Sequence, residues 1–154
     1  ITGGGQERYR RSGTENTLGI IGSGASCEKV AESIEDMPRL KDLRQTLEDG
    51  IKAIVPDAII VGEDADRLPV TTSAIIPNTS AETILLSLDM KGICISQGSA
   101  CSSGKSVPSR VLTAQGYTES QALAGLRISM AWHNTAADVE KFLQTFKTTM
   151  ERLR

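Results

Sequence analysis

Apolar residues recur at helical spacing through the first third of the chain. They stand three or four positions apart, at Ile20, Gly24, Cys27, Ala31 and Ile34, and again at Leu40, Leu43, Leu47, Ile51 and Ile54. A period near 3.6 residues predicts a long helical region. Because proline disfavours helical geometry in the residue before it, we expect an interruption at Asp36-Met37-Pro38.

From Ala58 onward the pattern changes to short apolar runs separated by polar turns. Four runs predict strands, at 59–61, 70–76, 93–95 and 126–130. Helices are expected at about 81–90, at 108–115, after Thr118 and from Thr135 to the end. The last shows one apolar face, made of Val139, Phe142, Leu143, Phe146, Met150 and Leu153.

Capping signals mark the starts of three of these helices. The pairs are Thr79 with Glu82, Thr118 with Gln121, and Thr135 with Asp138. A long helical region followed by interleaved strands and helices predicts a layered α/β fold.

Composition narrows the class of protein. The chain has 154 residues, 39% of them hydrophobic and 23% charged, which is typical of one soluble globular domain. The net charge of −2 gives no electrostatic reason to expect nucleic acid or a membrane as partner. No apolar run approaches the roughly 18 residues of a membrane span and no secretory signal is evident, so we expect a cytoplasmic protein.

The first residues and the aromatic content indicate a piece of a longer protein. The chain begins Ile1-Thr2 without an initiator Met, and aromatic residues make up only 3%. A segment that packs on a missing domain would explain the low aromatic content. A lean aliphatic core is the alternative.

The three cysteines lie in different contexts. Cys27 and Cys94 occupy apolar positions and are predicted to be buried. Cys101 follows a predicted strand, in a loop of small polar residues where we expect it to be exposed, mobile and reactive, with Lys105 near enough to lower its pKa. An incidental surface cysteine is the alternative. Without a C-x-x-C pair and with a single histidine, His133, we expect no metal site.

Two further positions are candidates for anion binding. Arg127 interrupts an apolar strand, where it either faces solvent, or pairs with an acid, or binds a carboxylate through its planar fork. Thr14 lies in a stretch rich in glycine, arginine and hydroxyls before a helix, so that either it helps to bind an anion or Ser12 or Thr14 simply caps the helix. His133 has no catalytic partner nearby in sequence and is expected at the surface.

Three segments in order resemble cysteine desulfurases of the NifS/IscS type, in the class V aminotransferase family. They are Gly3-Gly-Gly-Gln-Glu-Arg with Arg11-Ser-Gly-Thr-Glu-Asn16, Ser96-Gln-Gly-Ser-Ala-Cys-Ser-Ser-Gly104, and Leu126-Arg-Ile-Ser-Met130. The resemblance implies that Cys101 accepts sulfur from L-cysteine as a persulfide, that Arg127 holds the substrate carboxylate, and that Thr14 reaches the phosphate of pyridoxal phosphate (PLP) in the other subunit. Arg110 departs from the histidine usual in the family.

The resemblance also implies an architecture. Residues 1–17 would form the edge of the PLP-binding domain, 18–55 a long interdomain helix, and 56–154 the C-terminal small domain of a fold-type I transferase, with a four-stranded, mainly antiparallel sheet. No lysine here has the family's Ser-x-His-Lys context, so PLP would be bound mainly by residues outside this chain, which alone would be inactive.

The expected partners are L-cysteine, a second copy in a homodimer and a sulfur-acceptor scaffold, in iron–sulfur cluster assembly or another sulfur-transfer pathway. A selenocysteine-lyase-like enzyme and a non-catalytic dimerisation or docking fragment are the alternatives.

Overall fold

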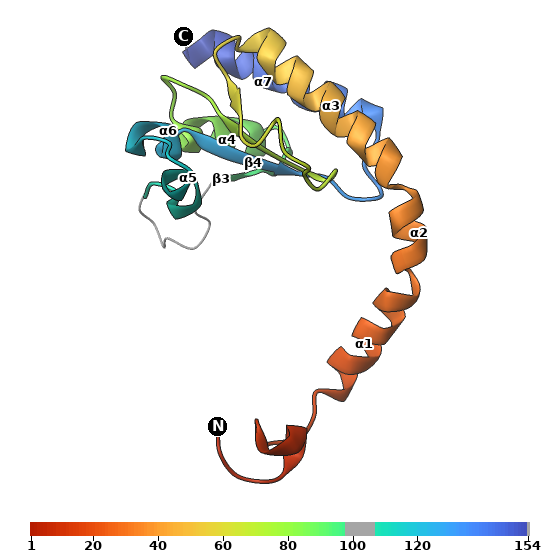
Figure 1. Cartoon of the computed structure of the whole chain (residues 1–154). Helices are drawn as coiled ribbons and strands as arrows, with labels where there is room; N and C mark the ends of the chain where they lie inside the picture. Colours follow the sequence, from red (N-terminus) through yellow and green to blue (C-terminus); the bar gives the residue numbers. More distant parts are fainter. Residues whose placement is uncertain (98–106, 154) are drawn as a thin grey trace. The chain divides into compact units, whose positions relative to one another are not determined.

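The computed structural model of the chain describes residues 1–97 and 107–153 (Figure 1). The chain divides into two compact units, Ile1–Asp36 and Met37–Arg154. In the part of the chain that the structure describes, no helix is both long and apolar enough to cross a membrane.

The first unit contains a short 3-10 helix, Gln6–Tyr9, followed by α1 (Thr17–Glu28) and α2 (Val30–Glu35). None of residues 1–36, all of which the structure describes, is buried. The N-cap of α1 is Asn16, whose side chain accepts from the backbone N–H of Gly19 at 3.2 Å. The expectation that Ser12 or Thr14 caps this helix was therefore wrong.

The predicted helical region is divided twice. The break before Pro38 is confirmed, because α2 ends at Glu35 and α3 (Met37–Ile54) begins directly after Asp36. A second break at Lys29 separates α1 from α2 and was not predicted. Helix α1 is rich in Gly and Ser, which are weak helix formers, so its local preference for continuing is small.

The second unit is built on one antiparallel sheet in the order β1-β2-β4-β3. Its strands are β1 (Ile59–Ile60), β2 (Thr71–Ile75), β3 (Ser96–Gln97) and β4 (Gly125–Ser129). This confirms the predicted four-stranded antiparallel α/β fold.

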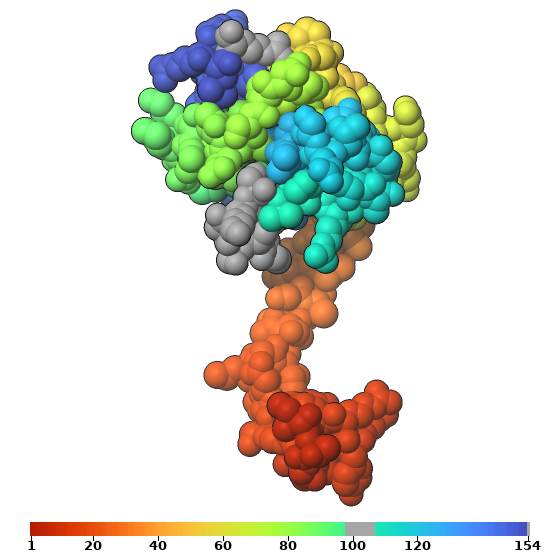
Figure 2. Space-filling view, turned by 90° about the vertical axis from the view of Figure 1, so that its left-hand side faces the viewer, coloured from red at the N-terminus to blue at the C-terminus, as the bar shows by residue number. Residues whose placement is uncertain are grey.

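Helices lie on both faces of this sheet (Figure 1). On one face α3, α4 (Ala81–Asp89) and α7 (Ala136–Leu153) enclose the main core. The strands contribute Ile60, Ala74, Leu126 and Ile128 to this core, and Ile76 follows directly after β2. On the other face α5 (Arg110–Ala114) and α6 (Glu119–Leu123) form one patch, teal to cyan in Figure 2, over a smaller apolar cluster with Val61, Ile75 and Leu112.

Helices α3 and α7 pack side by side, and a glycine makes their approach possible (Figure 1). A Cβ atom on Gly50 of α3 would lie 2.6 Å from Cδ2 of Leu143 on α7. Phe142 and Phe146 of α7 stack at 5.6 Å between ring centroids in the same core. The position of Gly50 therefore sets how closely these two helices can pack.

A buried carboxylate joins α3 to β2. Both oxygens of Glu48 accept from the guanidinium of Arg67 at 2.9 Å, and Oε1 also accepts from the hydroxyl of Thr72 at 2.8 Å. Arg44, one turn before Glu48 on α3, lies 3.8 Å from Oε1 and donates to the backbone carbonyl of Leu68 at 2.8 Å. The segment before β2 is thereby tied to the helix.

Two predicted boundaries near α4 were wrong. The strand expected at 93–95 is displaced to Ser96–Gln97, because the N–H of Ile93 donates instead to the carbonyl of Leu88 at the end of α4. Gly92, with φ of +71°, makes this turn possible. The cap of α4 is Ser80 and not Thr79, whose hydroxyl donates to the carbonyl of Ile76.

Candidate functional site

Strand β4 presents Arg127 on the face of the sheet opposite the main core. Its neighbours Leu126 and Ile128 point into that core, and alternation along the strand places Arg127 on the other side, where it is exposed. Among residues 1–97 and 107–153 its guanidinium has no hydrogen-bond or ion-pair partner. The sequence left three roles open for Arg127: facing solvent, pairing with an acid, or binding a carboxylate ligand. Pairing with an acid is excluded among the residues that the structure describes.

Hydroxyl groups flank Arg127 on both sides. In the sheet register Ser73 of β2 lies directly opposite Arg127, and so does Ser96 of β3 on the other edge of β4. The four strands contain no other ionisable residue. Arg127 thus rises from the sheet between two small hydroxyl side chains, with no carboxylate on the strands to neutralise it.

The same sheet face is divided into an apolar and a polar part. Toward β1, Ile75 pairs with Gly125 under α5, where a Cβ on Gly125 would lie 2.6 Å from Cδ1 of Leu112. One residue pair further along this face, Ser73 and Arg127 lie beyond this cluster. Helices α5 and α6 therefore cover the apolar part and leave the arginine accessible.

The turn that follows β4 is fixed from α3. Arg39 donates to the carbonyl of Asn134 at 2.7 Å and to that of Trp132 at 2.8 Å, while the Asn134 side chain accepts from the N–H of Ala131. His133 is exposed, as predicted, with its ring edge-on to Trp132 at 5.3 Å. These contacts hold the end of β4 without using Arg127.

Thr14 lies in a turn of the first unit that Arg11 organises. The Arg11 guanidinium donates to the carbonyls of Gly13 and Thr14, each at 3.0 Å, and pairs with Glu7 at 3.3 Å. Thr14 is exposed, and its hydroxyl has no hydrogen-bond partner among the described residues. The arrangement leaves that hydroxyl available to an external acceptor.

The cysteines differ from expectation. Cys27 and Cys94 are both exposed, so the prediction that they are buried was wrong. Helix α1 has no buried face to receive Cys27, and Cys94 lies in the turn between α4 and β3 instead of in a strand. Cys101 and Lys105, with the mobility predicted for their loop, lie outside the described residues.

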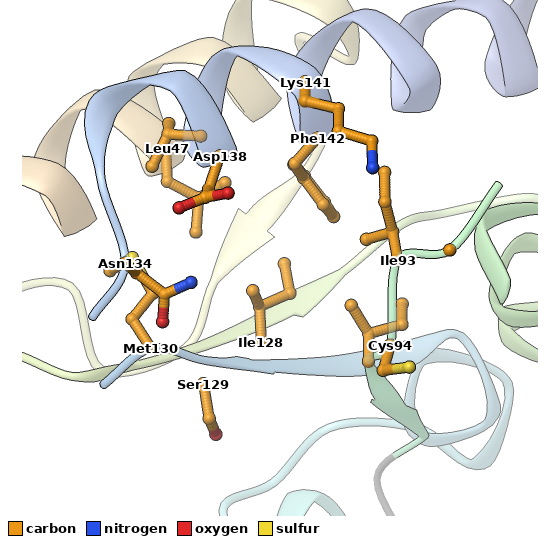
Figure 3. Close-up of a pocket in the computed structure, with 13 residues that line it drawn as sticks. Leu47, Ile93, Cys94, Ile128, Ser129, Met130, Asn134, Asp138, Lys141 and Phe142 are labelled. Atoms are coloured by element: carbon orange, nitrogen blue, oxygen red, sulfur yellow. The ribbon is translucent and has the colours of Figure 1, made fainter. Parts of the chain in front are cut away.

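A cavity of about 180 Å³ lies between the N-terminal half of α7 and the segment 93–95 (Figure 3). Cys94 borders it, together with Ile93, Ile128, Lys141 and Phe142. Of the predicted site residues that the structure describes, neither Thr14 nor Arg127 lines this cavity. It is a feature separate from the face that carries Arg127.

Comparison with known proteins identifies the family. The sequence model described as aminotransferase class-V matches residues 3–142. The chain belongs to this family. Cysteine desulfurase 2 of Trichormus variabilis is 40% identical over 154 residues, and cysteine desulfurase NifS of Azotobacter vinelandii is 36% identical over 155. Each match covers the whole chain but only 39% of the relative's length.

Solved structures of NifS-like proteins show the same fold. A NifS-like protein from Rickettsia africae aligns with a TM-score of 0.81 at 36% identity, over 98% of this chain and 39% of that one. A second structure, described as a NifS-like protein, gives 0.83 at 31% identity over 99% and 38%. The fold and the family are thus shared, and the chain spans about two fifths of the proteins it matches.

Sequence reasoning missed the serines beside Arg127. Alternation along 70–76 predicts which residues share a face, but it does not give the register between strands. Ser73 and Ser96 are 54 and 31 residues before Arg127 in the sequence, and only the pairing of β2 and β3 with β4 brings them together.

Proposed function

We propose that this chain is part of a PLP-dependent cysteine desulfurase, which takes sulfur from L-cysteine, releases L-alanine and leaves a persulfide on Cys101. The observation that carries the proposal concerns Arg127, which is exposed and has no polar partner among residues 1–97 and 107–153. It lies directly opposite Ser96, in the strand that leads into the Cys101 segment. Only Gly98, Ser99 and Ala100 separate β3 from Cys101.

Arg127 would bind the substrate carboxylate. A guanidinium offers two parallel N–H donors that match the two carboxylate oxygens, and the absence of any acid on the four strands leaves it free to do so. Its rigid position in the middle of β4 would fix where the rest of the substrate lies.

Cys101 would act as the nucleophile. Its thiolate attacks the sulfur of the substrate, the bond between that sulfur and the substrate's Cβ breaks, and a proton delivered to the Cβ carbon completes alanine. Among the described residues, Thr14 fits PLP, because its exposed hydroxyl has no hydrogen-bond partner there and suits the cofactor's phosphate. When bound, PLP supplies the electron sink that cleavage of the substrate requires.

The whole protein would extend beyond these residues. We place the edge of the PLP domain at 1–17, an interdomain segment at 18–55 and the small domain at 56–154. A homodimer would bring Thr14 of one subunit to the cofactor of the other. The lysine that holds PLP would lie outside this chain. A cytoplasmic scaffold protein, in iron–sulfur cluster assembly or another sulfur-transfer pathway, would accept the persulfide sulfur.

Sulfur transfer tests the proposal directly. The intact protein is given L-cysteine labelled with sulfur-35 or sulfur-34, and the label is located by peptide mass spectrometry. We expect it on Cys101, and we expect Cys101→Ser to abolish the persulfide while PLP absorbance is unchanged. Cys27→Ser and Cys94→Ala are matched controls, because both thiols are exposed. Label on Cys27 or Cys94, or normal turnover by Cys101→Ser, would contradict the assignment.

A further inference from the structure

We infer that Ser73 and Ser96 are positioning residues that orient the substrate carboxylate on Arg127. This inference rests on the proposed function, because it concerns the same carboxylate. It adds a feature that the role of the arginine alone does not contain: a row of three donors across β2, β4 and β3.

The sheet register creates this row. Residues directly opposite each other in antiparallel strands point to the same face, with Cβ atoms roughly 4.5–5.5 Å apart. Ser73 and Ser96 are both directly opposite Arg127, one on each side. The two hydroxyls therefore lie on either side of the base of the Arg127 side chain. An anion that the guanidinium holds close to the sheet surface, with the arginine side chain lying along β4, would have one hydroxyl on each side.

The hydroxyls are available for this purpose. Both serines are half-buried, and within residues 1–97 and 107–153 neither hydroxyl makes a hydrogen bond. Several other hydroxyls of the unit are engaged: Thr72 donates to Glu48, Thr79 to the carbonyl of Ile76, and Ser87 to that of Thr83. Thr71 and Ser129, the next pair on the same face, also carry hydroxyls without a hydrogen bond among the described residues, but neither lies directly opposite Arg127. The hydroxyls of Ser73 and Ser96 and the guanidinium of Arg127 thus lie on the same face of the sheet, and all three lack partners among the described residues.

One carboxylate can accept hydrogen bonds from Arg127, Ser73 and Ser96 at the same time. An ionised carboxylate has two oxygens and about four lone-pair positions, of which the guanidinium fork occupies two. The remaining positions point outward, toward the neighbouring strands, where Ser73 and Ser96 can donate. Hydroxyls are also neutral. An acid at either position would pair with Arg127 across the strands and compete with the substrate.

The test compares ligands that differ only in the carboxylate. In the intact, PLP-loaded protein we would measure the KM and kcat for L-cysteine and the inhibition constants of L-alanine and of ethylamine, which lacks the carboxylate. A hydrogen bond to a charged group contributes about 1.5–3 kcal/mol, so Ser73→Ala and Ser96→Ala should each weaken L-alanine about ten- to a hundredfold. Ethylamine inhibition should not change.

Further variants separate positioning from structure. Ser73→Thr keeps the hydroxyl in a residue that suits a strand and should retain L-alanine affinity, whereas Ser73→Asp should weaken it more than Ser73→Ala does. Ser87→Ala on α4 is the control and should behave as wild type. Equal weakening of L-alanine and ethylamine, or unchanged L-alanine affinity in both alanine variants, would overturn the inference.

Arg127→Ala distinguishes this inference from the proposed function. If Arg127→Ala removes the preference for L-alanine over ethylamine while the serine variants do not, only the role of the serines fails. If Arg127→Ala leaves that preference intact, the carboxylate site itself is wrong, and the serine inference fails with it.

Discussion

At the scale of single residues, Glu48 shows how a buried charge is accommodated in this fold. Burial alone would raise its pKa, but hydrogen bonds from Arg67 and Thr72 and the charges of Arg67 and Arg44 outweigh burial and hold the pKa below its usual value. The same pairing raises the pKa of Arg67. A carboxylate that is charged and fully bonded in the native state makes stability depend on pH.

We expect Glu48→Gln to lower the free energy of unfolding by about 3 kcal/mol at pH 7, because two largely buried guanidinium groups lose their counter-charge. The pKa of Glu48 is lower in the folded state, so its contribution is complete above its unfolded pKa, roughly 4.3, and is lost as pH falls through the folded value. Urea unfolding at pH 7 and pH 3.5 should therefore show a smaller difference between variant and wild type in acid.

Glu63→Gln is the matched control for this experiment. Glu63 pairs with Lys52 at the surface, with 49% of its side chain exposed, and such pairs contribute little. Its effect should stay within about 0.5 kcal/mol at pH 7. A Glu48→Gln variant as stable as the Glu63→Gln variant would show that the buried network does not contribute as its geometry indicates.

At the scale of secondary-structure elements, the contact between α3 and α7 depends on the missing side chain of Gly50. Glycine in a helix interior costs roughly 1 kcal/mol relative to alanine, so its presence there needs a compensating reason. The reason is the position of Leu143, whose side chain occupies the space that a Cβ would take.

We expect Gly50→Ala to destabilise the second unit by about 1 kcal/mol, because overpacking outweighs the gain in helix propensity. The double variant Gly50→Ala/Leu143→Ala should be no less stable than Leu143→Ala alone, which is the coupling expected for two groups in contact. Gly24→Ala in α1, where a Cβ would meet nothing within 4 Å, is the control and should not lower the unfolding midpoint. Additive effects of the two substitutions would contradict the contact.

Element boundaries could be predicted from sequence where the signal is local. The interruption before Pro38 and the capping box of Thr118 and Gln121 depend on neighbouring residues only, and both are confirmed. The strand at 93–95 failed because the end of α4 uses the N–H of Ile93. That competition between a helix terminus and a sheet ladder is not encoded in apolar periodicity.

The same distinction applies to the candidate site. Alternation in β4 predicts that Arg127 points away from the residues beside it, and the structure places it so. The burial predicted for Cys27 and Cys94 failed, because periodicity identifies an apolar face but not whether another element covers it. The serines beside Arg127 depend on pairing between distant strands, which a single sequence does not contain.

At the scale of the whole molecule, the two units differ in what they bury. Every buried residue among those described lies at or after Leu40. The first unit instead exposes large apolar side chains, namely Leu18, Ile20, Ile21, Val30 and Ile34. The core that resists unfolding is therefore contained in the second unit.

We expect residues 37–154 alone to unfold cooperatively, with a free energy of unfolding within about 0.5 kcal/mol of that of the full chain, since none of residues 1–36 is buried and changes at exposed positions have small effects. Because exposed apolar patches promote association, the full chain should also self-associate more strongly than 37–154. Denaturant unfolding and sedimentation velocity on both chains measure these quantities. A truncated chain that does not fold would show that residues 1–36 contribute to the core.

The arginines of α3 have a consequence for how this sequence can evolve. Arg39 and Arg44 donate to backbone carbonyls, those of Trp132 and Asn134 and that of Leu68. Every amino acid carries such a carbonyl, so these bonds survive most replacements on the acceptor side. Leu68 and Trp132 are 73% and 75% exposed, so we expect replacements there to preserve these bonds, whereas a shorter or neutral residue at Arg39 or Arg44 would lose them. In each of these hydrogen bonds, only the arginine donor depends on the identity of a side chain.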